Sequence, residues 1–350
     1  MFKTDDSTDM GNTIVDVAKK AGVSTSTVSL VINDSPRVNF RTKEHVLQVI
    51  KELGYTPNRG ARSIVTSQTH NIGLLVVLED NVSSDPYSIQ NIVNSLSTDV
   101  AAGVETAIQP THYGLIYARS SGKSAKNLPK IVDSSYIDGL IIAGGSYTRE
   151  FLNAIEMTRI PTVITGSNLN TKFISSIFCD PYAAMKEITE YVISTGRKHI
   201  ALINSSAISY NTALKQAGYR DALIESGLLY NDSMVISAGF SAIEGRNAMK
   251  SLLESKKEID AVVCAFDGLA IGVLQELHHR NIVVPVDIAV TGFEDSWIAS
   301  HAIPALTTVR IPKFEIGERL LNNLLDIISG RIQPGFKILV DSKIIVREST

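Results

Sequence analysis

Cysteine is scarce in this chain of 350 residues, which contains only Cys179 and Cys264. Each lies within or just after an apolar run, so we interpret both as buried free thiols rather than as a disulfide or a metal pair. Long apolar runs are missing as well: none reaches the roughly 20 residues that a membrane-spanning helix requires, and no signal peptide precedes the first helical pattern. These absences exclude disulfide-rich secreted proteins and membrane proteins, and they favour the reducing cytoplasm.

Sequence signatures of catalysis and of cofactor binding are absent too. Gly144-Gly145 follows an expected strand but lacks the GxGxxG spacing of a dinucleotide-binding loop, and neither GxxxxGK[ST] nor GxSxG occurs. His278-His279 lies at an expected helix end without the spacing of zinc ligands. We therefore predict no catalytic residue, no metal and no cofactor, and expect that the chain is not an enzyme.

Charge is distributed unevenly along the chain. The formal net charge is −3, yet residues 11–70 contain eight Lys and Arg residues against four Asp and Glu residues. The acidic excess therefore lies in the remainder of the chain. A basic segment on an acidic body suits a DNA-binding protein, because cations attract phosphate groups while the body is repelled by them.

Two short helical patterns stand at the start of this basic segment. Thr13 precedes apolar residues at helical spacing, and Gly22 ends that pattern in a turn. Ser24 follows as the predicted N-cap of a second helix that contains Val28. The first turns of this helix are rich in short polar side chains, which suit phosphate oxygens and base edges: Ser24, Thr25, Ser26, Thr27 and Ser29. The pattern indicates a helix-turn-helix, although a helical hairpin with a solvated serine–threonine face is the alternative.

A third helix is predicted over residues 40–53, with Asn39 as its N-cap and Gly54 at its end. The whole segment fits AxxAGVSxxTVSxVIN followed by VxxxTxxxVLxxIxELGYxPNxxARS. This long motif resembles the lactose-repressor/galactose-repressor (LacI/GalR) family of bacterial transcription factors. The resemblance implies a small all-α helix-turn-helix DNA-binding domain joined to an α/β, two-lobed domain similar to periplasmic binding proteins.

From residue 71 onwards, apolar runs typical of strands alternate with helical patterns. The runs are Ile72–Leu78, Tyr113–Tyr117, Gly139–Ile142, Thr162–Ile164, His199–Ile203, Ala261–Cys264 and Ile288–Thr291, and the helical patterns lie near 95–109, 149–157, 182–195, 211–226, 242–255 and 268–280. The alternation favours doubly wound parallel sheets, and the length favours two lobes. We expect the chain to cross between the lobes near 162–166 and 288–310.

These patterns divide the chain into four expected parts. They are a disordered leader (1–11), the helix-turn-helix DNA-binding domain (12–56), a hinge linker or hinge helix (57–70), and a two-lobed effector-binding and dimerisation domain (71–350).

The resemblance assigns DNA contacts to eleven residues: Ser24, Thr25, Ser26, Thr27, Leu30, Asn33, Tyr55, Asn58, Arg59, Ala61 and Ile64. Thr25 and Ser26 match positions that contact base edges. Leu30 stands at a reading position that is often polar or basic, so it either contacts a thymine methyl group or packs in the helical core. Ile64 matches the leucine that wedges into the minor groove when the hinge folds on DNA. Gly60 lowers helix propensity there by about 1 kcal/mol relative to alanine, and a plain flexible linker is the alternative.

The resemblance also locates four effector-site residues: Asp180, Lys215, Phe266 and Glu294. Asp180 follows a strand expected over 174–179. Lys215 replaces a usual arginine, Phe266 a frequent small polar residue, and Glu294 a common aspartate. Lysine is a mobile point charge where arginine is a rigid fork, and phenylalanine offers a stacking face in place of a hydrogen-bond partner.

Two neighbouring residues are assigned less specific places. We expect Asp267 to cap its own helix, and Trp297 to lie either at the cleft or at the dimer face.

These inferences predict a cytoplasmic, nucleoid-associated transcriptional regulator, a repressor of genes for carbohydrate uptake or catabolism. It is expected to bind a palindromic double-stranded DNA operator as a homodimer and to respond to a sugar-like small molecule that shifts the lobe arrangement. Two alternatives stay open: a DNA-binding regulator whose vestigial cleft is controlled by a protein partner, and a sugar-binding or sugar-processing protein with an acquired helix-turn-helix.

Overall fold

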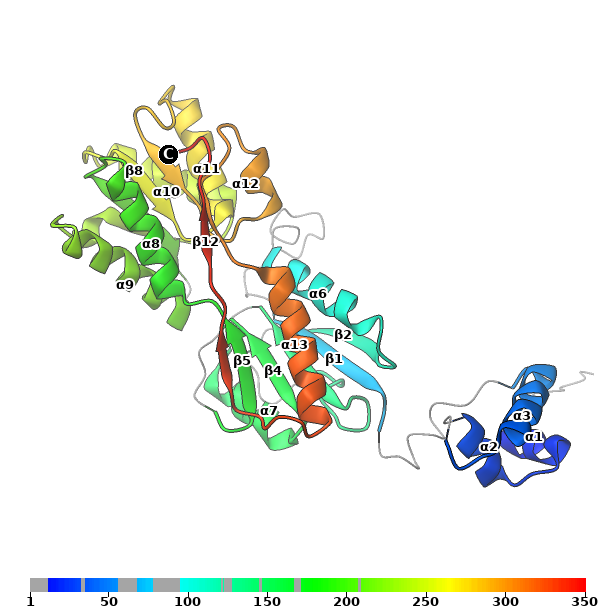
Figure 1. The fold of residues 1–350 in the computed structure, drawn as a ribbon. Coiled ribbons are helices and arrows are strands. Elements are labelled where there is room, and N and C mark those ends of the chain that lie inside the picture. Colours follow the sequence, from blue (N-terminus) through cyan, green and yellow to red (C-terminus); the bar gives the residue numbers. More distant parts are fainter. Residues whose placement is uncertain are drawn as a thin grey trace, which may run out of the picture. The chain divides into compact units, whose positions relative to one another are not determined.

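A computed structural model of the chain describes residues 12–32, 35–55, 68–77, 95–120, 122, 128–144, 147–166, 171–206 and 209–350. Its contacts divide the chain into two compact units, Met1–Thr69 and His70–Thr350 (Figure 1). Each unit has buried hydrophobic clusters of its own. None of the helices in the described part is both long enough and apolar enough to cross a membrane.

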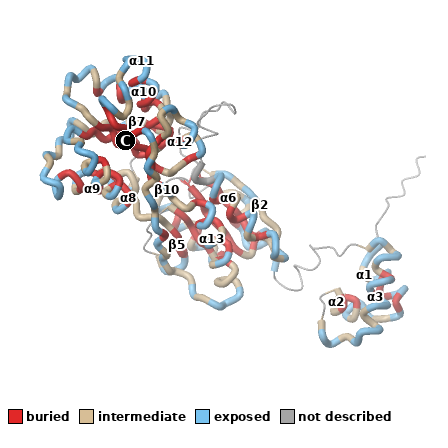
Figure 2. Tube along the Cα trace, turned by 45° about the horizontal axis from the view of Figure 1, so that its top comes forward, coloured by how far each residue is buried: buried red, intermediate tan, exposed pale blue. Residues whose placement is uncertain are grey.

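The described residues of the smaller unit form three helices: α1 (Ile14–Ala21), α2 (Thr25–Ile32) and α3 (Phe40–Leu53). These bounds confirm the three helices that the sequence predicts. Their inner faces meet in one small core (Figure 2), which consists of Val17, Ala18, Ala21, Val28, Val31, Val46 and Val49. Packing among these three helices therefore stabilises the helix-turn-helix.

Local capping interactions determine where these helices begin and end. Thr13 forms a capping box at the start of α1, and Gly22 ends that helix with a φ of 65°, a conformation that glycine adopts at little cost. Ser24 Oγ accepts a hydrogen bond from the backbone N of Thr27 at 3.1 Å, which confirms it as the cap of α2. Asn39 caps α3 in the same manner. Residues inside the segment thus fix the turn geometry.

The larger unit contains two lobes, each built on a parallel sheet (Figure 1). The sheet of the first lobe has the order β11-β5-β4-β3-β1-β2, and every pairing in it is parallel. Its strands are β1 (Asn71–Val77), β2 (Gly114–Ser120), β3 (Gly139–Ala143), β4 (Thr162–Thr165), β5 (Ile174–Phe178) and β11 (Lys337–Leu339). The inner strands β1 and β3 are buried on both faces, which is why they occur as apolar runs in the sequence.

Helices cover both faces of this first sheet. α6 (Ser95–Ile108) and α13 (Lys313–Ile328) share a core on one face, and α7 (Arg149–Thr158) packs on the other. α6 and α13 approach closely at Gly103, where a Cβ atom would lie 2.1 Å from the carbonyl oxygen of Phe314. The first lobe is therefore completed by a helix from near the end of the chain.

The sheet of the second lobe has the order β7-β6-β8-β9 and is also parallel throughout. Its strands are β6 (Ile200–Ser205), β7 (Val235–Ala238), β8 (Ala261–Cys264) and β9 (Ala289–Thr291). One face is covered by α8 (Pro181–Ser194) and α9 (Tyr210–Glu225), and the other by α10 (Ala242–Glu254) and α11 (Asp267–His279). A 3-10 turn (Asp232–Met234) and the short α12 (Trp297–His301) complete the lobe.

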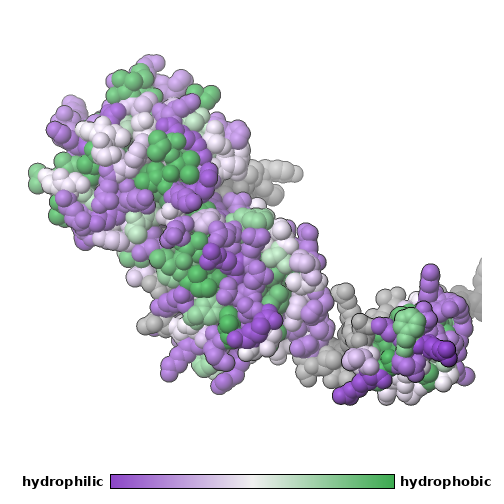
Figure 3. Space-filling model, viewed as in Figure 1, coloured by the Kyte–Doolittle hydropathy of each residue, from purple (hydrophilic) through white to green (hydrophobic). Residues whose placement is uncertain are grey.

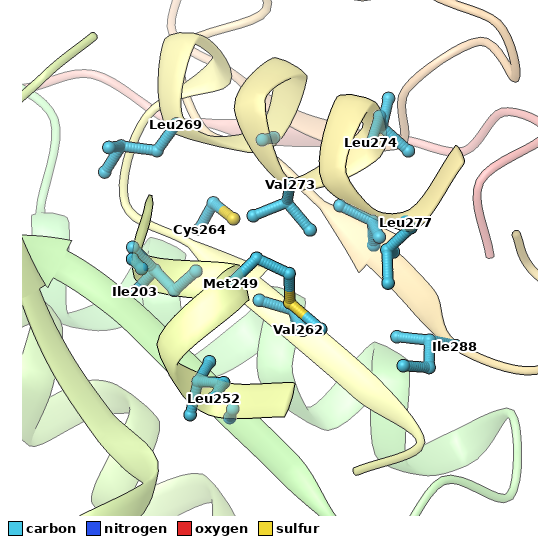
Figure 4. Packing of buried hydrophobic residues seen from close by; sticks show 14 of the residues in the cluster. Ile203, Met249, Leu252, Val262, Cys264, Leu269, Val273, Leu274, Leu277 and Ile288 are labelled. Atoms are coloured by element: carbon cyan, nitrogen blue, oxygen red, sulfur yellow. The ribbon is translucent and has the colours of Figure 1, made fainter. Parts of the chain in front are cut away.

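Both cysteines are free thiols, as the sequence predicts. Cys264 is fully buried, and Figure 4 shows its side chain in the apolar cluster that also contains Met249 and Val273. Cys179 is only partly buried, and its thiol donates a hydrogen bond to the carbonyl oxygen of Val340 at 2.8 Å. The expectation of two buried thiols is therefore right for one of them and incomplete for the other.

Three segments carry the chain between the lobes. They lie at 178–181 between β5 and α8, at 310–313 between β10 (Thr308–Arg310) and α13, and at 339–343 between β11 and β12 (Lys343–Ile345). β10 and β12 pair with each other in the antiparallel direction. We refer to these three segments as the connectors.

The predicted crossing near 162–166 is wrong, and the one predicted over 288–310 is placed too early, because the observed connector begins only at the last residue of that range. Residues 162–165 form β4 in the middle of the first sheet, and the chain remains in the second lobe until β10 ends at Arg310. A crossing has no hydrophobic pattern of its own, because it depends on which sheet the next strand joins.

The structure confirms the predicted fold class and each of the seven predicted strand runs and six predicted helices of the larger unit, within a few residues at their ends. The sequence interpretation missed several elements that lie at edges or near the end of the chain: β7, β10, β11, β12, α12 and α13.

Candidate functional site

The start of α2 exposes the polar side chains that the sequence assigns to DNA. Val28 is buried in the three-helix core, while Thr25 and Ser26 are exposed. Ser24 is exposed too, but its Oγ serves as the helix cap and lies 2.9 Å from Thr27 Oγ1. Thr25 and Ser26 are therefore the side chains of this turn best placed to reach an approaching duplex, and their contact with base edges stays a prediction.

Leu30 lies one turn further along α2 and is half-buried. It belongs neither to the buried cluster of the three-helix core nor to the partly buried residues that pack against that cluster. This placement argues against the core alternative. Contact with a thymine methyl group stays a prediction.

Tyr55 has a structural role beyond the end of α3. Its side chain packs against the three-helix core, and its backbone N donates to the carbonyl oxygen of Ile50 at 3.1 Å. Five further predicted DNA-contacting residues lie outside the described residues, and their assignments stay predictions: Asn33, Asn58, Arg59, Ala61 and Ile64.

Basic side chains are exposed on the smaller unit; they include Lys19, Lys20, Arg37, Arg41 and Lys51. Lys20 Nζ lies 3.0 Å from the carboxylate of Glu52 and links α1 to α3. Both side chains of this pair are almost half exposed, so water screens the attraction and the pair adds little stability. The remaining positive charge is suited to attract the phosphate backbone.

The second lobe has a topological switch point between β6 and β8. β6 comes first in the chain, β7 pairs on one side of it, and β8 pairs on the other. In open parallel sheets, ligands bind outside the carboxyl ends of the strands at such a point. The residues that gather at this edge come from α9 and from the segments after β8 and β9: Lys215, Ala265, Phe266, Asp267, Phe293 and Glu294.

Lys215 is the centre of this group and is almost fully buried, with 6% of its surface exposed. Its Nζ donates to the carbonyl oxygen of Ala265 at 2.7 Å. The same atom lies 4.0 Å from the ring centroid of Phe266 and 3.9 Å from that of Phe293. Two aromatic faces and one carbonyl oxygen therefore surround the ammonium group. We call these four residues the Lys215 cluster.

The environment of the Lys215 cluster changes the proton affinity of the lysine. Burial lowers the pKa of Lys215 from 10.5 to about 8, although the carboxylates of Glu294 and Asp267 act in the opposite direction. The lysine therefore keeps its charge at neutral pH in most molecules. The aromatic faces compensate part of the cost of burying that charge.

The structure thus brings Lys215 and Phe266 into direct contact and places Glu294 close enough to influence the lysine. Sequence reasoning missed Phe293 and Ala265 as members of this site. Phe240, from the segment after β7, was also missed; its ring meets that of Phe266 edge-on, with centroids 4.9 Å apart. Nothing in the local sequence reveals that the rings of Phe266 and Phe293 meet one lysine, because the segments are distant in the chain.

Asp267 does not cap its own helix, so that prediction is wrong. Phe266 occupies the N-cap of α11, and no side-chain hydrogen bond caps the helix there. Asp267 Oδ2 instead accepts from N and Oγ of Ser296 at 2.6 and 2.8 Å, and Oδ1 accepts from Oγ1 of Thr308 at 2.6 Å. Burial raises the pKa of Asp267 to about 6, against these hydrogen bonds. The carboxylate ties α12 and β10 to α11.

Asp180 shows no contact with the Lys215 cluster within the described residues. Its carboxylate caps α8, where it accepts from the backbone N of Tyr182 at 2.9 Å and of Ala183 at 3.4 Å. The capping geometry, with Pro181 in the first turn, explains an aspartate at this position without a ligand. Its role in effector binding stays a prediction.

In the described part of the chain, a direct hydrogen bond joins the first lobe to the same edge of the second lobe. Asn211 Nδ2, at the start of α9, donates to the carbonyl oxygen of Gly166 at 2.6 Å. Gly166 directly follows β4, so it marks the carboxyl ends of the first sheet. The carboxyl ends of the two sheets therefore meet near the Lys215 cluster.

Residues considered for other roles lie at the surface. Trp297 begins α12 and is 60% exposed, with its ring centroid 6.1 Å from that of His301. His278 and His279 end α11 and are exposed. Among the residues that the structure describes, no three His, Cys, Asp or Glu side chains lie together as metal ligands would.

Comparisons with known proteins cover both units. The sequence profile "Bacterial regulatory proteins, lacI family" matches residues 13–58, and "Periplasmic binding protein-like domain" matches residues 189–350. The HTH-type transcriptional regulator RegA of Clostridium saccharobutylicum is 31% identical over 350 residues, which cover 97% of this chain and 100% of RegA.

Two solved structures illustrate the likeness in three dimensions. The transcriptional regulator CelR in complex with cellobiose superposes with a TM-score of 0.72 and 28% identity, covering 97% of this chain and 100% of CelR. The Lac repressor bound to ONPG in its repressed state has a TM-score of 0.81, with 97% and 100% of the two chains covered. The sequence identity is 23%, so this second match shows a similar fold and nothing more.

Proposed function

Because this chain belongs to the LacI family of bacterial regulatory proteins and is a transcriptional regulator, we propose that it binds a palindromic DNA operator as a homodimer. A sugar or sugar derivative controls this binding, and the regulated genes serve carbohydrate uptake or catabolism. Two copies present two α2 helices to two half-sites, because the symmetry of a dimer matches that of a palindrome. The site of action is the nucleoid, in the cytoplasm.

One observation carries the DNA-binding proposal: α2 exposes Thr25 and Ser26 while Val28 on its other face fills the core. A helix that has a polar, exposed first turn and packs on a small helical core is suited to enter a major groove. The exposed basic side chains of the same unit supply the attraction to phosphate that does not depend on sequence.

The experiment is a selection of duplexes from a random pool by the full-length protein, followed by titration of the selected duplex by fluorescence anisotropy. We expect a palindromic sequence that binds at least about 1,000-fold more tightly than an unrelated duplex at physiological salt. A single half-site serves as the control for dimeric binding and is expected to bind much more weakly. Equal affinity for all duplexes at that salt would refute the proposal and favour the alternative of a sugar-binding protein.

Association into a dimer is supported by apolar side chains on the surface of the larger unit. Figure 3 shows such side chains gathered on the viewed face of both lobes, among hydrophilic ones. Large apolar residues with more than nine-tenths of their surface exposed include Leu229 and Ile303. Exposed apolar area of this kind commonly marks an interface.

A sugar-like effector is supported by the composition of the Lys215 cluster and its neighbourhood. Phe266 offers an aromatic face for the apolar side of a sugar ring, and Glu294 offers a carboxylate for hydroxyl groups. CelR, whose overall fold is similar, forms a complex with cellobiose. A thermal-shift assay of the full-length protein with cellobiose, glucose, gluconate and glucose 6-phosphate tests the proposal. A ligand at 100 times its Kd stabilises the folded state by about 2.7 kcal/mol.

A second candidate is control by a protein partner, with no small-molecule effector. It is favoured by the ammonium group of Lys215, which already has a carbonyl oxygen and two aromatic faces around it. If no compound of a broad metabolite panel raises the melting temperature or changes operator affinity, the result favours control by a protein partner. Saturable stabilisation by any compound, lost in Lys215→Met, decides against it.

A further inference from the structure

Two of the three connectors have an arginine at or shortly beyond their second-lobe end. Arg310 is the last residue of β10, immediately before the connector that leads to α13. Arg347 lies two residues after β12, which follows the connector from β11. Both arginines bind the same carboxylate, that of Asp295.

The contacts of Asp295 are short and largely shielded from water. Its Oδ2 lies 2.6 Å from Arg310 Nε, and its Oδ1 lies 2.6 Å from Arg347 Nη2. Only 8% of the Asp295 side chain and 16% of the Arg347 side chain are exposed, whereas Arg310 is about half exposed. Arg347 Nη1 also donates to the carbonyl oxygen of Leu306 at 2.7 Å. Charge-assisted hydrogen bonds in such a setting are stronger than ion pairs in water.

Asp295 belongs to the short loop after β9 that also contains Glu294, and this loop has a strained backbone. Glu294 has a φ of 105° and Asp295 a φ of 49°, backbone values that residues other than glycine rarely adopt. The loop is held along β10, because the backbone N of Glu294 donates to the carbonyl oxygen of Val309 at 2.8 Å. A strained loop of this kind persists only while its surroundings hold it, and such loops are common at ligand clamps.

The connector after Arg310 continues this chain of contacts into the first lobe. Ile311 packs against hydrophobic clusters of both lobes. Lys313 begins α13, is buried, and lies with its Nζ 3.6 Å from the carboxylate of Asp99 on α6. A continuous path therefore leads from the loop of Glu294 through Asp295 and Arg310 to the core of the first lobe.

We propose that Asp295 is a positioning residue that sets the arrangement of the two lobes, by holding Arg310 and Arg347 against the loop that contains Glu294. Displacement of this loop loosens two connectors at once. The bistable element is the strained loop together with its two ion pairs, and a group that binds Glu294 more tightly in one arrangement of the loop than in the other shifts its equilibrium. What binds Glu294 rests on the proposed function, whereas the holding of the lobes by Asp295 does not.

The test measures the distance between the lobes in the full-length protein without DNA and without effector. Spin labels are attached at Met157→Cys on α7 and at Ile243→Cys on α10, whose native side chains are 84% and 74% exposed. The native thiols react slowly at neutral pH, because Cys264 is fully buried and burial raises the pKa of Cys179 to about 11. The protein without the added cysteines measures any background labelling.

Asp295→Asn is expected to broaden the distance distribution from pulsed electron paramagnetic resonance and to shift its mean. The matched control is Asp326→Asn, which breaks the ion pair of Asp326 with Arg331 at the end of α13, within the first lobe. This control is expected to leave the distribution unchanged, so a purely structural loss of one ion pair does not imitate the effect.

A second variant guards against misfolding of Asp295→Asn. Arg310→Gln removes one of the two ion pairs of Asp295. Because the Arg310 side chain is half exposed, this variant is expected to cause a smaller change of the distance distribution in the same direction. Distributions equal to that of the wild type in the folded variants would overturn the proposal. Since neither DNA nor a sugar is present, this failure is distinct from a failure of the proposed function.

Discussion

The start of α2 and the Lys215 cluster are the two regions of this protein with the most specific chemistry, and they are built in opposite ways. α2 presents Thr25 and Ser26 in the open, on residues adjacent in the chain. The Lys215 cluster buries a lysine among rings from separate segments. From this contrast we expect that exposed polar side chains can change without loss of the fold, whereas a buried charge is tied to the stability of the lobe.

The reason for this difference is the cost of desolvation. An exposed hydroxyl group exchanges water for a partner at little net cost, so α2 can be specialised for DNA without effect on its core. A buried ammonium or carboxylate group must keep its partners, because an unpaired buried charge is strongly destabilising. Four predictions test how far this difference between the two regions holds.

The largest effect is expected from Asp267→Ala beside the Lys215 cluster. The substitution leaves the N and Oγ of Ser296 and the Oγ1 of Thr308 without their acceptor in a buried site. We expect the free energy of unfolding of the larger unit to fall by about 3–5 kcal/mol, measured by urea denaturation. Asp133→Ala, which removes an exposed acceptor for the backbone N of Ser135, is the control and should cost less than about 1 kcal/mol. Equal losses of unfolding free energy in Asp267→Ala and Asp133→Ala would contradict the expected difference between buried and exposed regions.

A pH-dependent effect is expected from Lys215 itself. Its pKa is about 8 in the folded protein and 10.5 when the lysine is solvated, so the unfolded chain binds more protons between these values. The stability of the wild type relative to Lys215→Met must therefore rise from pH 8 to pH 10.5, by about 3 kcal/mol in full. Urea denaturation at several pH values measures this difference. Lys250→Met, which removes an exposed lysine, is the control variant, and a curve for Lys215→Met as flat as that of the wild type contradicts the assigned burial cost.

Substitutions at the start of α2 should act on DNA binding and not on stability. Thr25→Ala and Ser26→Ala are each expected to weaken binding of the selected duplex by about 1–3 kcal/mol, because each removes a side chain that we propose to contact a base edge. The melting temperature should stay unchanged, since both side chains are exposed. Gln48→Ala, at an exposed position of α3, is the control for the same anisotropy titration. Unchanged affinity in both variants would mean that this turn does not read DNA.

The smallest effect is expected at Leu30. Leu30→Ala removes an apolar contact, so affinity should fall by about 1 kcal/mol for a duplex with a thymine at the contacted position and less for one without it. Leu47→Ala, which changes a leucine of α3 that is 45% exposed, provides a matched control with no expected change in binding. If Leu30→Ala lowers the melting temperature strongly and leaves affinity intact, the core alternative is right after all.

The missed elements differ in how far the sequence could have revealed them. The segment of α13 carries Ile316, Leu320 and Leu324 at helical spacing, so its helix was predictable from sequence. Its place beside α6 was not, because the chain reaches it only after completing the second lobe. The place of β11 was not predictable either, since it adds to the edge of a sheet whose other strands precede it in the chain.

The sequence by itself determined the class of the protein, the three helices of the smaller unit and the alternation of strands and helices in the larger one. Those features depend on caps such as Thr13 and Asn39 and on hydrophobic periodicity, which are properties of neighbouring residues. Only the tertiary structure decided that Phe293 and Phe266 surround Lys215, that Asp267 binds Ser296 and Thr308, and that Asp295 binds Arg310 and Arg347. Such partners are chosen by desolvation and by the geometry of packed segments, and neither is encoded in local spacing.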